Sequence, residues 1–303
     1  MHGVPLKKIL SISLAVLILA TLAFFYLRKN HGAVETPSQV ANTMTNDDSS
    51  RETELLDKGS RADPSKTWAS ESSGQIDQHF HDTRNKAESG DPVAQRELAE
   101  MYERCFIYSQ SSKNFAAMVA LFAKADPENA WRYSASSKRY SHYCDSIDNG
   151  KQIPLEAIQL WYAEAAKRGD LIAQIKVASK PDSQLNEAAY SALVAKAFES
   201  KDPDVIFALG DMLTLAKTSV DLGDYAHPAG GDYSEHAWEL AACRAGAECG
   251  PGSFRIDSGC MSGICNASNY ESLIKKNFIP PAQLKFLERD VEHINSLLDQ
   301  RPR

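Results

Sequence analysis

Six cysteines are the residues of this sequence with the widest range of possible chemistry. Thiolates bind zinc or act as nucleophiles, whereas thiols in an oxidising compartment pair as disulfides. The last four are spaced Cys243-x5-Cys249 and Cys260-x4-Cys265, which fits the usual zinc motifs poorly. We therefore expect disulfides and no metal centre, with a four-cysteine zinc site as the alternative. The cysteines are Cys105, Cys144, Cys243, Cys249, Cys260 and Cys265.

The first two cysteines are expected to pair with each other. Cys105 lies fourteen residues after Asp91, and Cys144 lies eighteen residues after Asp126. Both Asp residues are expected to begin helices, so both cysteines lie at similar heights on second helices of neighbouring hairpins. The offset of four residues is about 6 Å along a helix axis, which small shifts can absorb.

The last four cysteines are expected to form the nested pairs Cys243–Cys265 and Cys249–Cys260. If one helix runs through Cys243 and Cys249, they lie about 120° apart around it and cannot bridge each other. A chain reversal over residues 250–259 then brings both nested pairs into one register. A bend near residues 250–252 would allow the crossed pairing instead.

Other groups offer little evidence for catalysis. The sequence has no H-E-x-x-H, G-x-S-x-G or phosphate-binding loop motif, and a nucleophile at Cys144 beside His142 would need a free thiol. An acidic cluster lacks the residue order of a calcium loop. We expect that the protein is not an enzyme and that it binds no cofactor or metal. The acidic cluster consists of Asp221, Asp224, Asp232 and Glu235.

The elements that must position the cysteines are marked by a recurring pattern around Asp. Residues 87–95 and 166–174 both read A-x-x-G-D-x-x-A-Q, and two further copies lack the Gly. The four Asp residues are 35, 44 and 32 positions apart. The motif residues are Gly90, Asp91, Pro92, Asp126, Pro127, Gly169, Asp170, Asp202 and Pro203.

Each copy has the chemistry of a junction between two helices. Asp is a favoured helix N-cap, and Pro suits the first helical turn because its missing N–H needs no partner there. Gly before Asp can end the preceding helix in a left-handed conformation. The pattern predicts a helical hairpin every 32 to 44 residues, and stacked hairpins bury a continuous core. Chance recurrence of Asp-Pro between unrelated helices is the alternative.

This pattern resembles the Sel1-like repeat family, whose helical hairpins are related to tetratricopeptide repeats. The resemblance covers about residues 75–216, and it is weakened where the second and fourth copies lack Gly. It implies an all-α helical-hairpin repeat solenoid over residues 76–217 and a role as an adaptor in complex assembly. The residues that carry it are Ala87, Gly90, Asp91, Ala94, Gln95, Leu98, Ala99, Met101, Tyr102, Trp161, Ala165, Ala166, Gly169, Asp170, Ala173 and Gln174.

Residues 218–303 are expected to form a helical C-terminal region that carries disulfides. After Pro280-Pro281, apolar residues recur at alternating spacings of three and four, which predicts an amphipathic helix. We expect this helix to cap the last apolar face of the repeats; a partner-binding zipper is the alternative. Its apolar residues are Leu284, Leu287, Val291, Ile294 and Leu298.

The N-terminal part predicts a membrane anchor. Residues 9–27 are uncharged and apolar, long enough to span a hydrocarbon core of about 30 Å. A cleavable signal peptide is the rival interpretation. The polar residues 28–75 predict a flexible linker. The numbers of basic residues before and after the apolar segment are nearly equal, so they do not decide its orientation in the membrane. Residues 1–8 form only a short tail, however, and every cysteine follows the anchor. We expect a cytoplasmic tail, a single pass through the inner membrane, and a periplasmic body.

The repeat pattern and the family that it resembles imply a scaffold, and the charge narrows the partners that it can bind. The first 29 residues contain four of the 33 basic residues and no acidic one, so 29 basic and 40 acidic residues follow, a net charge of −11. Such a surface is unsuited to nucleic acid. The sequence predicts an extracytoplasmic scaffold that binds another, unidentified envelope protein. The alternatives are a cell-wall or β-lactam-related binding protein or hydrolase, and a structural spacer.

Overall fold

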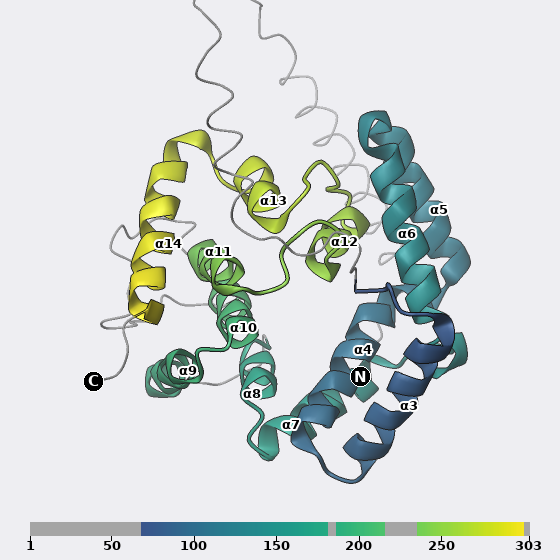
Figure 1. Ribbon diagram of the computed structural model, residues 1–303, viewed down its shortest axis with the longest axis horizontal. Helices are drawn as coiled ribbons and strands as arrows, with labels where there is room; N and C mark the ends of the chain where they lie inside the picture. Colours follow the sequence, from purple (N-terminus) through teal and green to yellow (C-terminus); the bar gives the residue numbers. More distant parts are fainter. Residues whose placement is uncertain (1–67, 181–185, 216–234, 300–303) are drawn as a thin grey trace, which may run out of the picture. The chain divides into compact units, whose positions relative to one another are not determined.

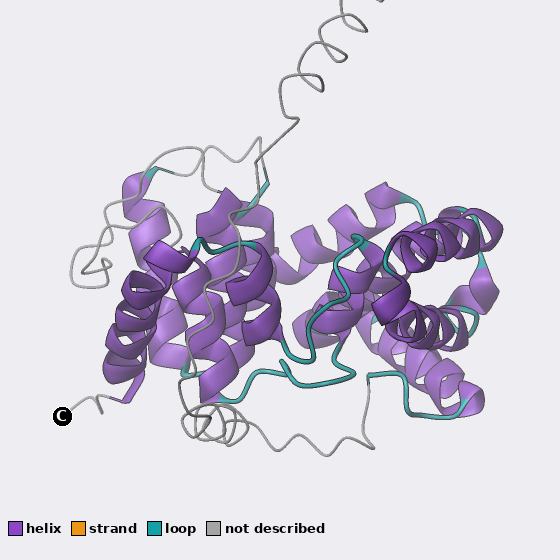
Figure 2. Cartoon of the chain, turned by 90° about the horizontal axis from the view of Figure 1, so that it is seen from above, coloured by secondary structure: helices purple, strands orange, loops and turns teal. Residues whose placement is uncertain are grey.

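The structure, a computed structural model, describes residues 68–180, 186–215 and 235–299 (Figure 1). Every described residue belongs to one compact unit, Glu52–Arg303. The described ranges contain twelve α-helices and no strand, so the predicted all-α class is confirmed for them (Figure 2).

The α-helices are α3 (Ser73–Glu88), α4 (Pro92–Gln110), α5 (Ser112–Ala125), α6 (Ala130–Cys144), α7 (Leu155–Lys167), α8 (Leu171–Ala178), α9 (Glu187–Ser200), α10 (Pro203–Leu215), α11 (Glu235–Ala245), α12 (Phe254–Met261), α13 (Tyr270–Asn277) and α14 (Leu284–Asp299). Short 3-10 helices are η1 (Pro127–Asn129), η2 (Asp148–Gly150) and η4 (Pro281–Gln283).

The two complete Gly-Asp copies form nearly identical helix junctions. Gly90 ends the turn after α3 at φ 94°, and Gly169 does the same after α7 at φ 97°. The next residue caps the following helix: Asp91 accepts a hydrogen bond from the Ala94 N–H at 2.9 Å. Asp170 accepts one from the Ala173 N–H at 2.8 Å. Both junctions therefore have the predicted cap chemistry.

The two copies that lack Gly also lie between helices, but their local structure differs. The Asp126 carboxylate accepts hydrogen bonds from the Asn129 side chain at 3.0 and 3.1 Å, and η1 separates it from α6. The Asp202 carboxylate accepts from the Asp204 N–H at 2.9 Å, while Lys201 takes the left-handed conformation at φ 54°. All four Asp residues thus mark helix boundaries, although only two do so in the same way.

The helices do not stack in simple chain order. Contacts run from α3 to α4, then to α7, α8, α10, α11 and α14, while α9 packs against α8 and α10. The pair α5–α6 is set aside from this succession, and α6 contacts α4 and α12 (Figure 1). The hairpin at Asp126 is therefore inserted between the two complete copies.

Two apolar clusters fill the described part of the compact unit. One lies among α3 to α8 together with the end of α12, and it includes the buried Phe80, Leu98 and Tyr133. The other extends from α8 to α14 around the fully buried Trp238. Val291 on α14 is fully buried and α14 packs against α11, so the C-terminal helix covers an apolar face of this cluster.

The folded part begins earlier than the sequence suggested. Helix α3 starts at Ser73, inside the range 28–75 predicted as a flexible linker, because Ser72 and Gln75 form a capping box. Trp68 also packs against the helices, with its ring centroid 4.9 Å from that of Tyr143. The linker prediction is therefore wrong for residues 68–75.

Several predictions fall outside the described residues. These are the tail at 1–8, the membrane helix at 9–27, the linker up to residue 67, and the acidic loop at Asp221, Asp224 and Asp232. Within the described ranges, no helix has both the length and the apolar character needed to cross a membrane.

Candidate functional site

A disulfide joins α4 to the inserted hairpin. Cys105 on α4 and Cys144 at the end of α6 are bonded, with their Cα atoms 5.3 Å apart. This is the pairing that the sequence favoured. The bridge fixes the α5–α6 hairpin beside the succession of helices that α4 belongs to.

The nested pairing of the last four cysteines is wrong. The structure pairs Cys243 with Cys249 and Cys260 with Cys265, with Cα–Cα distances of 5.5 and 4.3 Å. All six cysteines are therefore in disulfides, and the alternative four-cysteine zinc site is not formed.

The nested prediction failed because it extended one helix too far. Helix α11 ends at Ala245, and the N–H of Ala247 donates back to the carbonyl of Ala242, so the chain turns before it reaches Cys249. The same arrangement follows α12, where the N–H of Ile264 donates to the carbonyl of Gly259. Each disulfide therefore closes the turn at the end of its own helix.

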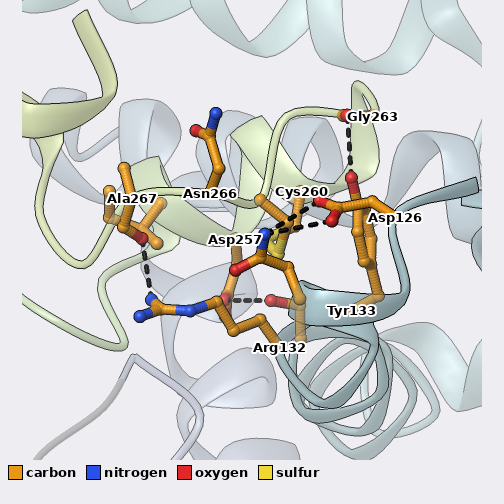
Figure 3. The surroundings of a disulfide bond; sticks show 12 residues. Asp126, Arg132, Tyr133, Asp257, Cys260, Gly263, Asn266 and Ala267 are labelled. Carbon is orange, nitrogen blue, oxygen red and sulfur yellow. Dashed lines mark hydrogen bonds between the residues drawn. A yellow bond between two sulfur atoms is a disulfide. The ribbon is translucent and has the colours of Figure 1, made fainter. Parts of the chain in front are cut away.

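The segment around the second of these turns is bound to the inserted hairpin (Figure 3). The hydroxyl of Tyr133 on α6 donates to the carbonyl of Gly263 at 2.7 Å. Arg132 donates to the carbonyl of Ala267 at 2.9 Å. Gly263 lies within the turn that the Cys260–Cys265 bridge closes and Ala267 follows it, so the disulfide-closed segment presents both carbonyls to α6.

Asp257 on α12 is the centre of this contact. It is fully buried and accepts hydrogen bonds from Ser136 at 2.5 Å, from Arg139 Nε at 2.6 Å and Nη2 at 2.7 Å, and from Trp68 Nε1 at 2.7 Å. The donors come from positions 118 to 189 residues away in the sequence. One carboxylate on α12 thus connects this helix to Trp68 and to α6.

Docking of α12 on α6 completes a groove that α4, α8 and α10 also line. Two adjoining cavities of about 290 and 350 Å³ share part of their walls and together form this central groove. The residues common to both are Glu103, Arg104, Lys176, Phe207, Asp211, Phe254 and Arg255. Aromatic rings and charges of both signs therefore face the same space.

Most charges in the central groove are already paired. Lys176 Nζ lies 3.7 Å from Glu103 and 3.6 Å from Asp211. The hydroxyl of Tyr162 donates to Glu103 at 2.6 Å, and burial together with that carboxylate raises the pKa of Tyr162. Arg255 pairs with Asp204 at 2.9 Å. The groove is a fixed charge network rather than an open cluster of reactive groups.

Asp211 gives this network a pH dependence. Burial, with a contribution from nearby Glu239, raises the pKa of Asp211 from its ordinary value of 3.8 to about 6, although Lys176 opposes the shift. Between these pH values the folded state holds the proton that the unfolded chain has released. The stability that Asp211 contributes is therefore complete below about pH 4 and is lost as the pH rises through about 6.

We expect Asp211→Asn to remove this part of the pH profile. Urea unfolding should show wild type losing stability relative to the variant between pH 4 and pH 7, because only wild type takes up a proton at position 211 on folding, and that uptake becomes less favourable as the pH rises. Two parallel curves over this range would show that Asp211 titrates alike in the folded and unfolded states, against this account.

The recurring Asp motifs fix the helices that form the groove, but their own side chains contribute little to its wall. The Gly-Asp junctions at Asp91 and Asp170 set the starts of α4 and α8, and Arg96 in the groove donates to Asp170 at 3.1 Å. Asp202 is the one motif residue that lines the groove. The residues that the sequence analysis missed include Arg104, Lys176, Asp211, Phe254 and Asp257.

The described part of the molecule has no group of three or more His, Cys, Asp or Glu side chains arranged to hold a metal ion. The described ranges define an all-α, disulfide-bonded fold with a central groove. Comparisons with protein-family models, curated proteins and solved structures find no match.

Proposed function

We propose that the chain is a membrane-anchored extracytoplasmic scaffold that binds a segment of another envelope protein in the central groove. The observation that carries this proposal is the groove itself, which α4, α8, α10 and α12 line with aromatic and paired charged side chains. Aromatic and Arg residues are enriched where proteins bind each other. A paired charge network orients a polar ligand without leaving charges unsatisfied when water is displaced.

A Sel1-like repeat solenoid is the architecture proposed for the helices that carry the groove. Two features support it: the matched junctions at Gly90-Asp91 and Gly169-Asp170, and the packing of α4 directly against α7. The Arg96–Asp170 ion pair links the first junction's helix to the second junction. In this proposal α5–α6 is an insertion between two stacked repeats.

The location of the scaffold is inferred from two sequence features. The apolar residues 9–27 supply an anchor, and the remaining chain holds every cysteine. All six are paired, which suits an oxidising compartment such as the periplasm. A tether of this kind would hold the groove near the inner membrane.

The exposed residue Ile107 gives a clean test of the proposal. Its side chain lines the groove and the residue is 60% exposed, whereas Leu160 on α7 is 55% exposed and lies outside the groove lining. Ile107→Asp should reduce recovery of one discrete partner protein about tenfold or more in a cross-linked pull-down of the full chain. Leu160→Asp should leave recovery unchanged, and circular dichroism should show both variants folded.

Two results would contradict the scaffold. Equal recovery of the partner by both variants would show that the groove does not bind it. Enrichment of muropeptides in place of a protein would favour the cell-wall binding or hydrolytic alternative.

A further inference from the structure

One cation in the central groove lacks the pairing that the others have. Within the described ranges, no carboxylate lies at ion-pairing distance from Arg104, whereas Arg96, Lys176 and Arg255 each have at least one acidic partner. The Arg104 guanidinium instead lies 5.3 Å from the ring centroid of Phe254. It is half-buried and lines both cavities, so it offers donors to an anion that enters the groove.

Part of the cavity wall beside Arg104 is apolar. The cavity of about 350 Å³ is lined by Ile107, Phe115, Phe254 and Met261 next to the guanidinium. A group that fits here carries a negative charge and a bulky apolar part close together. A carboxylate placed in this cavity without Arg104 would lose water and meet only Lys176 and Arg255, which already have carboxylate partners, so its burial would be unfavourable.

The two ends of the groove differ in charge. The lining of the cavity beside Ile107 has three cations, Arg104, Lys176 and Arg255, and two carboxylates, Glu103 and Asp211. The lining of the other cavity has four basic and six acidic side chains. There, no cation of the described chain pairs with the Asp202 or Glu248 carboxylate. The five charged residues beside Ile107 line both cavities, and the other cavity adds one cation and four further carboxylates. The groove thus favours a cation at that acidic end, and Arg104 beside the apolar wall is the place for an anion.

We propose that this groove receives the C-terminal residue of the partner polypeptide, with the terminal carboxylate on Arg104 and an apolar side chain in the adjacent cavity. The inference rests on the scaffold function proposed above. A terminal residue carries its carboxylate and side chain on the same Cα, so both enter one cavity. In an internal extended segment, an acidic residue and its apolar neighbour point to opposite sides.

The charge difference along the groove also sets the direction of the bound chain. With the terminal carboxylate at Arg104, the preceding residues pass toward Asp202 and Glu248. Basic residues a few positions before the end would pair with these two carboxylates. The expected ligand is therefore a chain end with basic residues followed by a bulky apolar last residue.

A pair of labelled peptides tests this directly. Fluorescence anisotropy of the full chain would compare the fluorescein-labelled hexapeptide Gly-Lys-Lys-Ser-Ala-Phe with a free carboxylate and the same peptide ending in an amide. The acid should bind about tenfold or more tightly than the amide. Arg104→Gln should abolish this difference, and Arg104→Lys should retain part of it. The matched control, Lys138→Gln at an exposed position of α6 outside the groove, should preserve it.

The outcomes distinguish failure of the chain-end inference from failure of the proposed scaffold function. Equal binding of acid and amide to wild type, or a preference that survives Arg104→Gln, overturns the chain-end inference. If the Ile107→Asp variant still loses its partner in that case, the scaffold stands and binds an internal segment. A third outcome would also overturn the inference. If octanoate displaces the peptide from the groove, and replacing the peptide's Phe does not change its affinity, the ligand is a small carboxylate rather than a chain end.

Discussion

Asp257→Ala should lower the free energy of unfolding by about 3–5 kcal/mol, as measured by urea denaturation at neutral pH. The carboxylate is fully buried and accepts hydrogen bonds from Ser136, Arg139 and Trp68. Removing it leaves the Arg139 guanidinium, which is 24% exposed, without its counter-charge. It also leaves the Trp68 indole N–H without an acceptor.

Asp204→Ala is the matched control for this prediction. Asp204 also pairs with an arginine, Arg255, but its side chain is 59% exposed. Loss of such a surface pair should change stability by less than about 1 kcal/mol. If both variants lose the same stability, Asp257 does not organise the contact between α6 and α12.

Replacing both Cys105 and Cys144 by Ala should destabilise the fold by about 4 kcal/mol, because their bridge closes a long loop. The two cysteines are 39 residues apart, whereas Cys243 and Cys249 are only 6 apart. The loop-entropy relation predicts about 2 kcal/mol for the double Ala variant of the shorter loop. Urea unfolding under non-reducing conditions measures both.

The relative losses of stability of the two double variants decide whether the α4–α6 bridge matters more. A larger loss for the Cys243/Cys249 variant than for the Cys105/Cys144 variant would contradict the assigned role of the α4–α6 bridge. Non-reducing peptide mapping provides the covalent check, since a peptide joining Cys243 to Cys265 would restore the nested pairing.

Features set by local chemistry could be predicted from the sequence. The junctions at Asp91 and Asp170 depend on residues within one turn of each other, so the N-cap and the preceding Gly are visible in the order of residues. The Cys105–Cys144 pair was predicted from the similar heights of the two cysteines after Asp91 and Asp126, although α6 begins only after η1. The all-α class followed from the same junctions.

Local chemistry also contained a signal that was misread. Gly246 lies three residues after Cys243, and Gly263 lies three residues after Cys260. Each Gly lies in the turn that ends a helix and brings the next cysteine back. A helix predicted to end before Gly246 would have given the observed pairing. The Ser72–Gln75 capping box likewise marked the true start of α3.

The central groove could not be predicted in this way. Asp257 finds its partners 118 residues or more away, and no local pattern marks a residue for a contact at that distance. The insertion of α5–α6 also has no signature, because Asp126 repeats the Asp-Pro pattern of a stacked hairpin. The charges that meet in the groove come from α4, α8, α10 and α12 and from the segments that precede α10 and α12, which only the tertiary packing brings together.

Photo-cross-linking from the groove tests the central claim, that this groove holds a partner protein, most directly. Position 107 would carry p-benzoylphenylalanine in the full chain (Ile107→p-benzoylphenylalanine), and position 160 would carry it in the control. Irradiation of native membranes should give one discrete protein adduct from position 107, mapped by mass spectrometry to a single segment of the partner, and none from position 160. No adduct from position 107, or the same mixture of adducts from both positions, would contradict the claim.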